Sequence, residues 1–225
     1  MLPRVLEPEA MDTAEEAEAY DRMDHSTVNR AFASDWLATW MTVRGDAPSC
    51  HMIDIGTGTA LIPIELCGQS PHVRITAVDL ADEMLKRAEV NCRRAGWESR
   101  ITLQKIDAKG IPYGDGTFDS VVSNTIIHHI PQPRQALAEM HRVLAPGGLL
   151  FLRDLYRPES ADEVEHFVRT YAGNETAEQQ QLFRQSFHAA LTVEEVAKLL
   201  EELGISPTAV RMTSDRHWTI STWKS

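Results

Sequence analysis

Three aspartates, Asp54, Asp79 and Asp107, each stand near the end of a short apolar run in the first half of the 225-residue chain. If these runs are parallel strands, their carboxyl ends meet at one edge of a sheet, where open α/β sheets bind ligands. Asp79 is suitably spaced to accept hydrogen bonds from both hydroxyls of a ribose, and Asp107 to accept one from an exocyclic amine such as that of adenine. A single aspartate of this kind is as often a helix cap, but three in succession are stronger evidence for a ligand site at this edge.

The first of these runs leads into a glycine turn, within the stretch "HMIDIGTGTALIPIEL". Gly56 and Gly58 let the backbone approach a ligand closely and adopt torsion angles that a side chain would penalise. A dinucleotide fingerprint requires a third glycine where this chain has Leu61, and a phosphate loop requires Lys followed by Ser or Thr, which the turn lacks. Both kinds of phosphate-binding loop are therefore disfavoured for this turn.

Short apolar runs alternate with helical stretches from Cys50 onward, and this alternation predicts a parallel sheet with helices on both faces. The last two runs are joined too closely for a parallel crossover, so the last strand must run antiparallel to its neighbour. We therefore expect a Rossmann-like, doubly wound sheet of seven strands, mostly parallel, with N-terminal helices and a helical insertion after the fifth strand. The seven runs are "CHMIDI", "VRITAVDL", "ITLQKID", "FDSVVSN", "LLFLRDL", "PTAVRMT" and "RHWTISTW".

Helical patterns lie before, within and after the predicted sheet. Thr13 with Glu16, and Thr192 with Glu195, form capping boxes, and Gly204 is placed to end the last helix. The second helix carries an apolar stripe at four-residue steps, which we expect to dock on the core. The first dozen residues are expected to be loose. The stripe is Val28, Phe32, Trp36 and Trp40, and the expected helices cover residues 13–23, 26–42, a stretch ending near 68, 81–95, 133–144, 159–171 and 176–187.

Composition excludes several classes of protein. The formal net charge is -11 and no Lys/Arg cluster is dense enough to follow a phosphate backbone, so we expect no nucleic-acid partner. Three widely spaced cysteines indicate neither a disulfide framework nor a metal knuckle, and we expect no metal. No stretch approaches the roughly 18 apolar residues of a membrane span, and the start lacks the apolar core of a signal peptide. We expect a cytoplasmic monomer or homodimer without membrane contact.

Four motifs resemble, in order and spacing, those of class I S-adenosylmethionine-dependent methyltransferases, especially the small-molecule branch. They are "DIGTGTA", "AVDLADEML", "IDAKGIPYGDGTFDSVVSNTIIHHI" and "RVLAPGGLLFLRD". The resemblance covers residues 50–154, and the last two strands through their arrangement. Ala60 stands where the family often has a third glycine, and we expect this to change the loop only slightly.

The resemblance implies S-adenosyl-L-methionine as cofactor and S-adenosyl-L-homocysteine as product. It further implies a single domain in which residues 50–154 bind the cofactor, 1–49 and 155–190 are helical lids, and 191–225 add the last helix and two strands. The implied cofactor-binding residues are Gly56, Thr57, Gly58 and Asn124 at the methionine part with Asp54 just beneath the turn, Asp79 at the ribose, Leu80, Met84, Asp107 and Ala108 at the adenine, and Tyr20 folded over the cofactor.

Methyl transfer from a sulfonium is an in-line displacement, so the protein must mainly hold an acceptor about 3 Å from the methyl group and exclude water. A general base helps if the acceptor is a phenol, an alcohol or a protonated amine. His128 and His129 are the candidates, because imidazole titrates near neutral pH, and His128 is the one expected to face the acceptor. In similar enzymes a histidine here often only shapes the pocket. Arg153 and Asp154 alternate in direction, and either is a candidate for contacting the acceptor.

The sequence leaves the acceptor atom open among O, N, S and C. It lacks the signatures of amide or adenine N-methylation, and Ser123–Asn124 cannot replace the paired acids of cation-dependent O-methyltransferases. We expect a small-molecule acceptor. Two alternatives stay open, namely a non-catalytic cofactor-binding sensor or regulatory partner that uses the apolar stripe as an interface, and an enzyme of the same fold that modifies the sulfonium itself.

Overall fold

The computed structural model describes residues 2–8, 12–45 and 49–225, so the expected loose start is tested only at residues 2–8 and 12. The chain divides into two compact units, which we describe separately. The turn unit contains Ala10–Asn124, Gln135–Phe151 and Thr222–Ser225, and the histidine unit contains Met1–Glu9, Thr125–Arg134 and Leu152–Ser221. The expected division into one domain with two lids stays a prediction.

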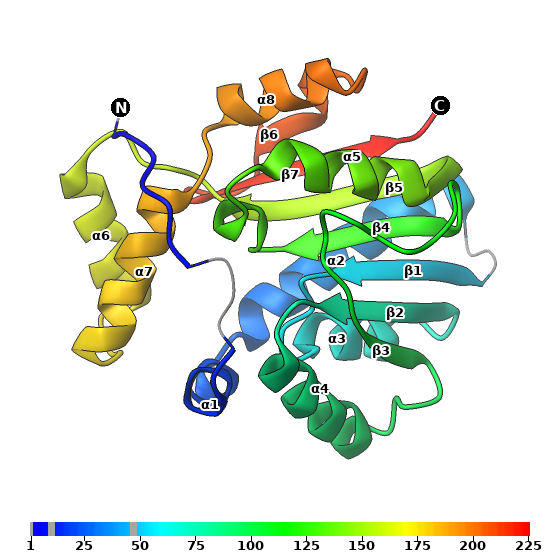
Figure 1. Cartoon of the computed structure of the whole chain (residues 1–225), viewed down its shortest axis with the longest axis horizontal. Helices are drawn as coiled ribbons and strands as arrows, with labels where there is room; N and C mark the ends of the chain where they lie inside the picture. Colours follow the sequence, from blue (N-terminus) through cyan, green and yellow to red (C-terminus); the bar gives the residue numbers. More distant parts are fainter. Residues whose placement is uncertain (1, 9–11, 46–48) are drawn as a thin grey trace. The chain divides into compact units, whose positions relative to one another are not determined.

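Seven strands form one sheet in the order β3-β2-β1-β4-β5-β7-β6 (Figure 1). β1 pairs in parallel with β2 and β4, β2 pairs in parallel with β3, and β6 is antiparallel to β7. The expected Rossmann-like sheet, with its antiparallel last strand, is thereby confirmed. The strands are β1 (Cys50–Ile55), β2 (Val73–Asp79), β3 (Ile101–Lys105), β4 (Phe118–Asn124), β5 (Leu144–Leu155), β6 (Val210–Met212) and β7 (His217–Trp223).

The α-helices begin and end within two residues of the predicted bounds, whereas the short 3-10 helices η1 and η2 were not predicted, and η2 takes up the first three residues of the expected strand "PTAVRMT". Both predicted capping boxes are present, with the Glu16 amide donating to Thr13 Oγ1 and the Glu195 amide to Thr192 Oγ1, each at 3.2 Å. The helices are α1 (Ala14–Arg22), α2 (Ser26–Arg44), α3 (Leu61–Gln69), α4 (Asp82–Ala95), η1 (Ile127–His129), α5 (Pro133–Val143), α6 (Ala161–Tyr171), α7 (Ala177–Ala189), α8 (Val193–Glu202) and η2 (Pro207–Ala209). None of them, over the described residues, is long and apolar enough to cross a membrane.

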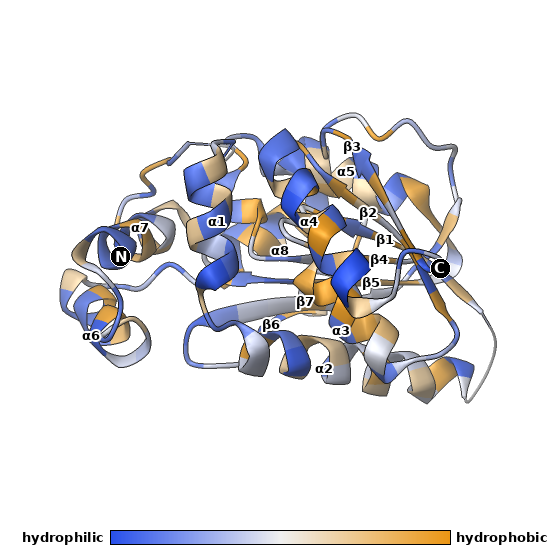
Figure 2. Cartoon of the chain, turned by 90° about the horizontal axis from the view of Figure 1, so that it is seen from below, coloured by the Kyte–Doolittle hydropathy of each residue, from blue (hydrophilic) through white to orange (hydrophobic). Residues whose placement is uncertain are grey.

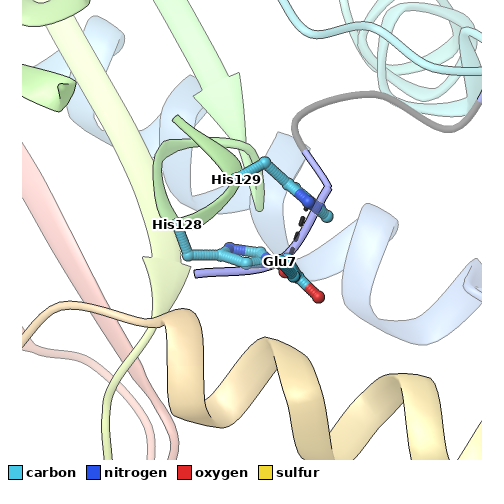
Figure 3. A group of neighbouring side chains, drawn as sticks. All are labelled: Glu7, His128 and His129. Carbon is cyan, nitrogen blue, oxygen red and sulfur yellow. Dashed lines mark ion pairs between the residues drawn. The ribbon is translucent and has the colours of Figure 1, made fainter. Parts of the chain in front are cut away.

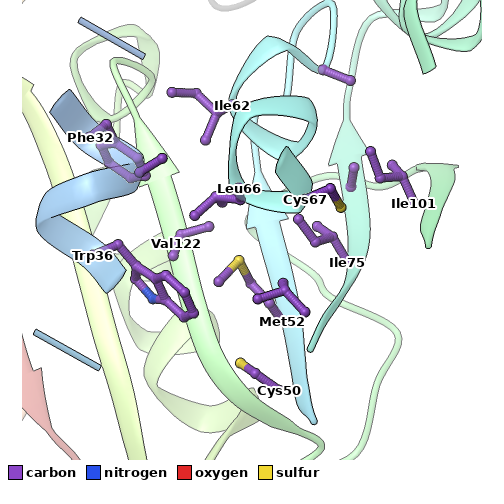
Figure 4. Close-up of a cluster of buried hydrophobic side chains, with 14 of the residues drawn as sticks. Phe32, Trp36, Cys50, Met52, Ile62, Leu66, Cys67, Ile75, Ile101 and Val122 are labelled. Carbon is purple, nitrogen blue, oxygen red and sulfur yellow. The ribbon is translucent and has the colours of Figure 1, made fainter. Parts of the chain in front are cut away.

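The core of the turn unit lies between α2, α3 and the central strands (Figure 4). Phe32 and Trp36 are fully buried there and Trp40 is 5% exposed, whereas Val28, at the start of the stripe, is 38% exposed. The Trp36 indole donates from Nε1 to Ser120 Oγ at 3.0 Å, so its polar atom is satisfied inside the core. The apolar stripe thus docks on the core as predicted, and it leaves no exposed row of aromatic residues.

The layers of the turn unit follow from its amphipathic helices. Figures 1 and 2 show α2 and α3 on one side of β1 and β4 and α5 on the other. α4 carries both strongly hydrophilic and strongly hydrophobic residues (Figure 2), and its buried positions Met84, Ala88, Asn91 and Cys92 recur at helical spacing.

β3 ends at Lys105, two residues before Asp107. Our expectation that this strand ends in Asp107 was therefore wrong. The chain turns at Asp107 because its carboxylate accepts from the Lys109 amide.

The histidine unit has its own small core, and residues 2–8 are held within that unit. The Arg4 guanidinium donates from Nε to the Ala189 carbonyl at 2.7 Å and from Nη2 to the carbonyls of His128 and Ile130. The Val5 amide donates to the carbonyl of His188 at 2.9 Å. This segment is therefore anchored, and the expectation that it is loose was wrong because its partners lie more than 120 residues away in sequence. The core consists of Leu155, Val164, Phe167, Val168, Phe187 and Ala190.

Candidate functional site

The glycine turn between β1 and α3 is a tight, left-handed bend. Gly56 and Gly58 have φ angles of +72° and +54°, and Ala60 has +63°. The amides of Gly56 and Thr57 both donate to the Val78 carbonyl, at 2.8 and 2.9 Å, which ties the turn to the end of β2. A side chain at Gly56 or Gly58 would be strained at these angles, and Ala60 carries such strain already.

Asp79, at the end of β2, links the turn to the start of α4. Its Oδ2 accepts from the Gly58 amide at 2.7 Å and its Oδ1 from the Ala81 amide at 2.9 Å. Burial raises the pKa of this carboxyl, and the amide hydrogen bonds oppose the rise. Each carboxylate oxygen has further lone pairs, so Asp79 is held in place while it retains the capacity to accept from ligand hydroxyls.

A hollow opens at the carboxyl ends of β1 and β4, beside the glycine turn. Three buried side-chain oxygens around it have no hydrogen-bond partner among the described residues, namely Asp54 Oδ2, Thr57 Oγ1 and Thr59 Oγ1. Buried polar atoms are nearly always paired in folded proteins, so three orphans at one hollow indicate a missing donor. The lining residues are Tyr20, Asn29, Asp54, Gly56, Thr57, Thr59, Leu61, Ile62 and Asn124.

Asp54 lies beneath the turn and is 2% exposed. Burial raises the pKa of its carboxyl to about 7; the nearby Thr57 hydroxyl opposes the rise, and the neighbouring Asp79 carboxylate adds to it. An unpaired buried carboxylate is costly, so Asp54 gains most from a ligand that brings a positive charge. An ammonium group meets this requirement.

Tyr20 closes the hollow from α1. It packs with Ala17, Ala81 and Met84, and burial raises the pKa of its hydroxyl to about 12, with Asp79 and Asp54 adding to the rise. The helix that carries Tyr20 is fastened to α4, since Asn91 Nδ2 donates to Asp21 Oδ1 at 2.6 Å. The same Nδ2 donates to the Thr59 carbonyl at 3.0 Å, so one buried amide connects α1, α4 and the turn.

The structure brings part of the predicted cofactor set to the hollow. Tyr20, Asp54, Gly56, Thr57 and Asn124 line it. The remaining predicted contacts do not line the hollow: Gly58 and Asp79 are bonded to each other beside it, Met84 is buried against Tyr20, and Leu80, Asp107 and Ala108 are partly buried at the ends of β2 and β3.

The Asp107 carboxyl remains available for a ligand, although it is already paired. Partial burial works against its ionised form, but the backbone amide and the ammonium of Lys109 outweigh this and lower the pKa of Asp107. Lys109 Nζ lies 2.9 Å from Oδ1. Asp107 is therefore an anion at neutral pH and can accept a hydrogen bond from an amine.

Sequence reasoning missed several residues of the hollow, namely Asn29, Thr59, Leu61 and Ile62. Thr59 could have been predicted, because the alternation in "GTGT" places a second hydroxyl two residues after Thr57. Asn29 could not, because the sequence pattern of α2 predicts only that the apolar side of this helix faces the core.

In the histidine unit, His128 and His129 meet Glu7 from the N-terminal segment (Figure 3). His128 is 1% exposed, and its Nδ1 lies 2.5 Å from Asp154 Oδ1. Its Nε2 lies 3.2 Å from Glu7 Oε1, and His129 Nδ1 lies 3.2 Å from the same oxygen. The sequence analysis did not predict Glu7 at this site, because a local sequence pattern cannot indicate a contact with His128, which lies 121 residues further along the chain.

Two carboxylates decide the charge of His128. Burial acts to lower the pKa of its imidazole, but Asp154 and Glu7 outweigh it and raise that pKa to about 9. His129 has a lowered pKa, because burial and the charge of His128 both oppose its protonation. Without another cation, His128 already carries its proton at neutral pH, which argues against the general-base role for which it was a candidate.

The two residues at the end of β5 differ in role. Asp154 is fully buried, and its oxygens accept from the amides of His128 and Leu155 as well as from the His128 ring. It is thus occupied inside the protein, which argues against the acceptor contact that we considered for it. Arg153 is partly buried and donates from Nε to Thr219 Oγ1 at 3.0 Å, so its acceptor contact stays a prediction.

Comparison with known proteins supports the interpretation of the turn unit as similar to methyltransferases. Residues 53–152, somewhat less than half of the chain, match the family model described as a methyltransferase domain. The ubiquinone/menaquinone biosynthesis C-methyltransferase UbiE of Geotalea daltonii is 31% identical over 113 residues, which are 50% of this chain and 48% of that protein. The demethylmenaquinone methyltransferase of Porphyromonas gingivalis is 31% identical over 63% of this chain and 58% of its own. The chain thus spans about half the length of the curated relatives it matches.

A solved structure from Methanococcus maripaludis, described as a candidate S-adenosyl-L-methionine-dependent methyltransferase, covers 98% of this chain and 97% of its own with a TM-score of 0.71. At 21% sequence identity, this likeness shows the fold. The resemblance to class I methyltransferases that we drew from residues 50–154 is confirmed. Residues 53–152 of this chain are similar to the methyltransferase domains of that family model, and the chain has the fold of class I S-adenosylmethionine-dependent methyltransferases.

Proposed function

We propose that the protein is an S-adenosyl-L-methionine-dependent methyltransferase that transfers a methyl group to a small-molecule acceptor. The observation that carries this proposal is the set of three unpartnered buried oxygens at the hollow, Asp54 Oδ2, Thr57 Oγ1 and Thr59 Oγ1. All three can accept hydrogen bonds, and the α-ammonium group of the cofactor is a donor of matching charge. The residues present therefore fit the amino-acid end of the cofactor.

The residues of the turn unit would divide the binding of the cofactor among them. Asp54, Thr57 and Thr59 accept from the ammonium group, and Asp79, held by the Gly58 amide, accepts from the ribose hydroxyls. Asp107 accepts from the adenine amine beside Ala108, with Leu80 and Met84 against the ring. Asn124 contacts the amino-acid part, and Tyr20 excludes water from the hollow.

The bound sulfonium supplies an already activated methyl group. The chain's own residues then have to fix the reacting geometry and keep water out, and neither task requires a covalent intermediate on the protein. No general base is assigned. This suits an acceptor that reacts without losing a proton first, and it leaves His129 as the remaining candidate of the two histidines.

The relatives named as C-methyltransferases of ubiquinone and menaquinone biosynthesis indicate which acceptor to test first. An electron-rich ring carbon, such as that of a quinol precursor, attacks the methyl group without a general base, and the hydrogen on that carbon leaves afterwards as a proton to water. The test uses a labelled methyl donor, with a demethylated quinol and with a fractionated metabolite extract. Labelled product together with S-adenosyl-L-homocysteine supports the proposal. Binding of the cofactor without turnover on any acceptor would instead favour a sensor.

The remaining parts of the proposal concern the surroundings of the protein. We propose a cytoplasmic enzyme without nucleic-acid partners, supported by the net charge of -11, and a monomer or homodimer. The alternative of a regulatory partner has lost its main support, because Phe32, Trp36 and Trp40 of the apolar stripe are buried in the core.

A further inference from the structure

We propose that Glu7, His128 and His129 bind a divalent transition-metal ion, and that Zn²⁺ is the ion that these donors fit best. Two imidazole nitrogens and one carboxylate oxygen form a donor set that proteins use for zinc. This site goes beyond the proposed methyl transfer and does not depend on it. An ion on Nδ1 of His129 would exclude that ring as a general base, which the proposed reaction does not require. It replaces the sequence-based expectation that the protein has no metal, which considered only the cysteines and the acids after β4.

The spacing of the three side chains suits an ion at their centre (Figure 3). Glu7 Oε1 lies 3.2 Å from His128 Nε2 and 3.2 Å from His129 Nδ1, and all three atoms lie within 4.8 Å of one another. Ligand atoms bound to zinc at about 2.0–2.1 Å in a tetrahedral arrangement are roughly 3.3 Å apart. Two of the three separations therefore already have the length that a bound ion imposes.

Glu7 Oε1 faces ring nitrogens of both histidines. His128 Nδ1 is engaged with Asp154, so Nε2 is the atom that this ring turns toward Glu7. A proton on Nε2 pairs Glu7 Oε1 with one histidine only, yet the same oxygen is equally near His129 and has no aligned hydrogen bond among the described residues. His129 Nδ1 also lies 3.4 Å from the Pro8 carbonyl. An ion at the centre would replace the proton on His128 and contact all three ligand atoms.

The ligands are held from behind, as is usual in protein metal sites. Asp154 orients the His128 ring through Nδ1, which leaves Nε2 as the ligand atom. Ser186 Oγ donates to the second oxygen of Glu7 at 3.3 Å. Arg4 fixes the N-terminal segment by donating to the carbonyls of His128 and Ile130. Three protein ligands leave a fourth position for water or an anion, and the 22% exposed side chain of His129 gives access to it.

The test is a calorimetric titration of Zn²⁺ into the full chain without an affinity tag, after treatment with a chelator. We expect saturation at about one ion per chain, and Glu7→Gln and His129→Gln should each weaken binding by roughly tenfold or more. Matched controls are Glu201→Gln on α8 and His166→Gln on α6, since both side chains are exposed. Binding by these controls should equal that of the native chain.

His128 is left intact in these variants, because its removal would leave Asp154 buried without its partner. Circular dichroism checks that each variant is folded. Co²⁺ then serves as a spectroscopic probe, and its visible spectrum should show tetrahedral nitrogen and oxygen ligation without a thiolate charge-transfer band. A thiolate band would assign the ion to Cys50, Cys67 or Cys92. That result, absence of saturable binding, or equal binding by both ligand variants and the native chain would overturn the proposal.

Discussion

The hollow at the glycine turn and the cluster of Glu7, His128 and His129 are both polar and buried, yet they are built in opposite ways. Most of the hollow comes from one short segment, Asp54 to Ile62, and its side-chain oxygens are left without partners. The cluster joins residues more than 120 positions apart, and its nitrogens already face carboxylates. The oxygens of the hollow are therefore available to a ligand. The polar groups of the cluster instead contribute to holding distant segments of the chain together.

The largest expected effect tests the hollow. Asp79→Ala removes the acceptor for the ribose hydroxyls and for the Gly58 amide. Hydrogen bonds to a charged group contribute about 1.5–3 kcal/mol, so the affinity for S-adenosyl-L-homocysteine should fall roughly 10- to 150-fold. The control is Asp82→Ala, a nearby exposed acid that pairs only with Lys105 among the described residues. Equal affinities for Asp79→Ala and the native chain would remove Asp79 from the cofactor site.

The next effect tests how the distant segment is held. Arg4→Ala removes three hydrogen bonds from a charged donor to the carbonyls of His128, Ile130 and Ala189. We expect the free energy of unfolding to fall by about 2–3 kcal/mol, and amide exchange of residues 2–8 to become faster. In the control Arg22→Ala, an exposed pair with Glu18 within α1 is lost, at a cost of less than about 1 kcal/mol. Similar losses in both variants would show that the segment needs no such anchor.

A third effect is the pH dependence of cofactor binding, which reports the ionisation of the unpartnered Asp54 carboxyl in the hollow. Burial raises the pKa of Asp54 to about 7. The folded state therefore binds more protons than the unfolded chain between about pH 4 and 7, and the contribution of Asp54 to stability is lost as the pH rises through that window. A ligand ammonium group needs the ionised form, so affinity should rise on the order of tenfold from about pH 5.5 to 7.

Asp54→Asn provides the control for this pH dependence. The amide has nearly the same shape and does not titrate, so the variant should bind S-adenosyl-L-homocysteine more weakly at pH 7 and with a nearly flat profile below it. An unchanged slope in Asp54→Asn would assign the titration to another group.

The smallest effect concerns the turn itself. Gly58→Ala places a side chain at a φ of +54°, which costs about 1–2 kcal/mol, while the added carbon would meet Tyr20 Cε1 at an ordinary 3.7 Å. The free energy of unfolding in urea should fall accordingly. Gly68→Ala, inside α3 and with nothing within 4 Å, should instead gain about 0.5–1 kcal/mol. If both substitutions change the free energy of unfolding in the same direction, the left-handed conformation of the turn at Gly58 is refuted.

The features that could be predicted from the sequence are those decided by near neighbours. Strand and helix periodicity, the capping boxes at Thr13 and Thr192, and the glycine turn each depend on a few adjacent residues, and all are confirmed. The burial of Trp36 followed from its spacing along α2. Even here the end of β3 was misplaced by two residues, because apolar Ile106 continues the strand pattern after the pairing has stopped.

The features that could not be predicted depend on contacts between distant segments. Nothing near Glu7 in a Pro- and Glu-rich start indicates that its carboxylate is 8% exposed beside two histidines. The pairing of His128 with Asp154 was also missed, although both residues were singled out as candidates. Alternation along β5 gives the face of Asp154, but only the fold shows that its oxygens are consumed by His128 and Leu155.

The proposed methyl transfer requires that the hollow beside the glycine turn bind the cofactor and its product. Equilibrium titration of S-adenosyl-L-homocysteine into the native full chain at pH 7.5 measures this binding. We expect saturation at about one molecule per chain, together with a rise in the midpoint of thermal unfolding. A folded chain that shows no saturable binding would rule out this role for the hollow.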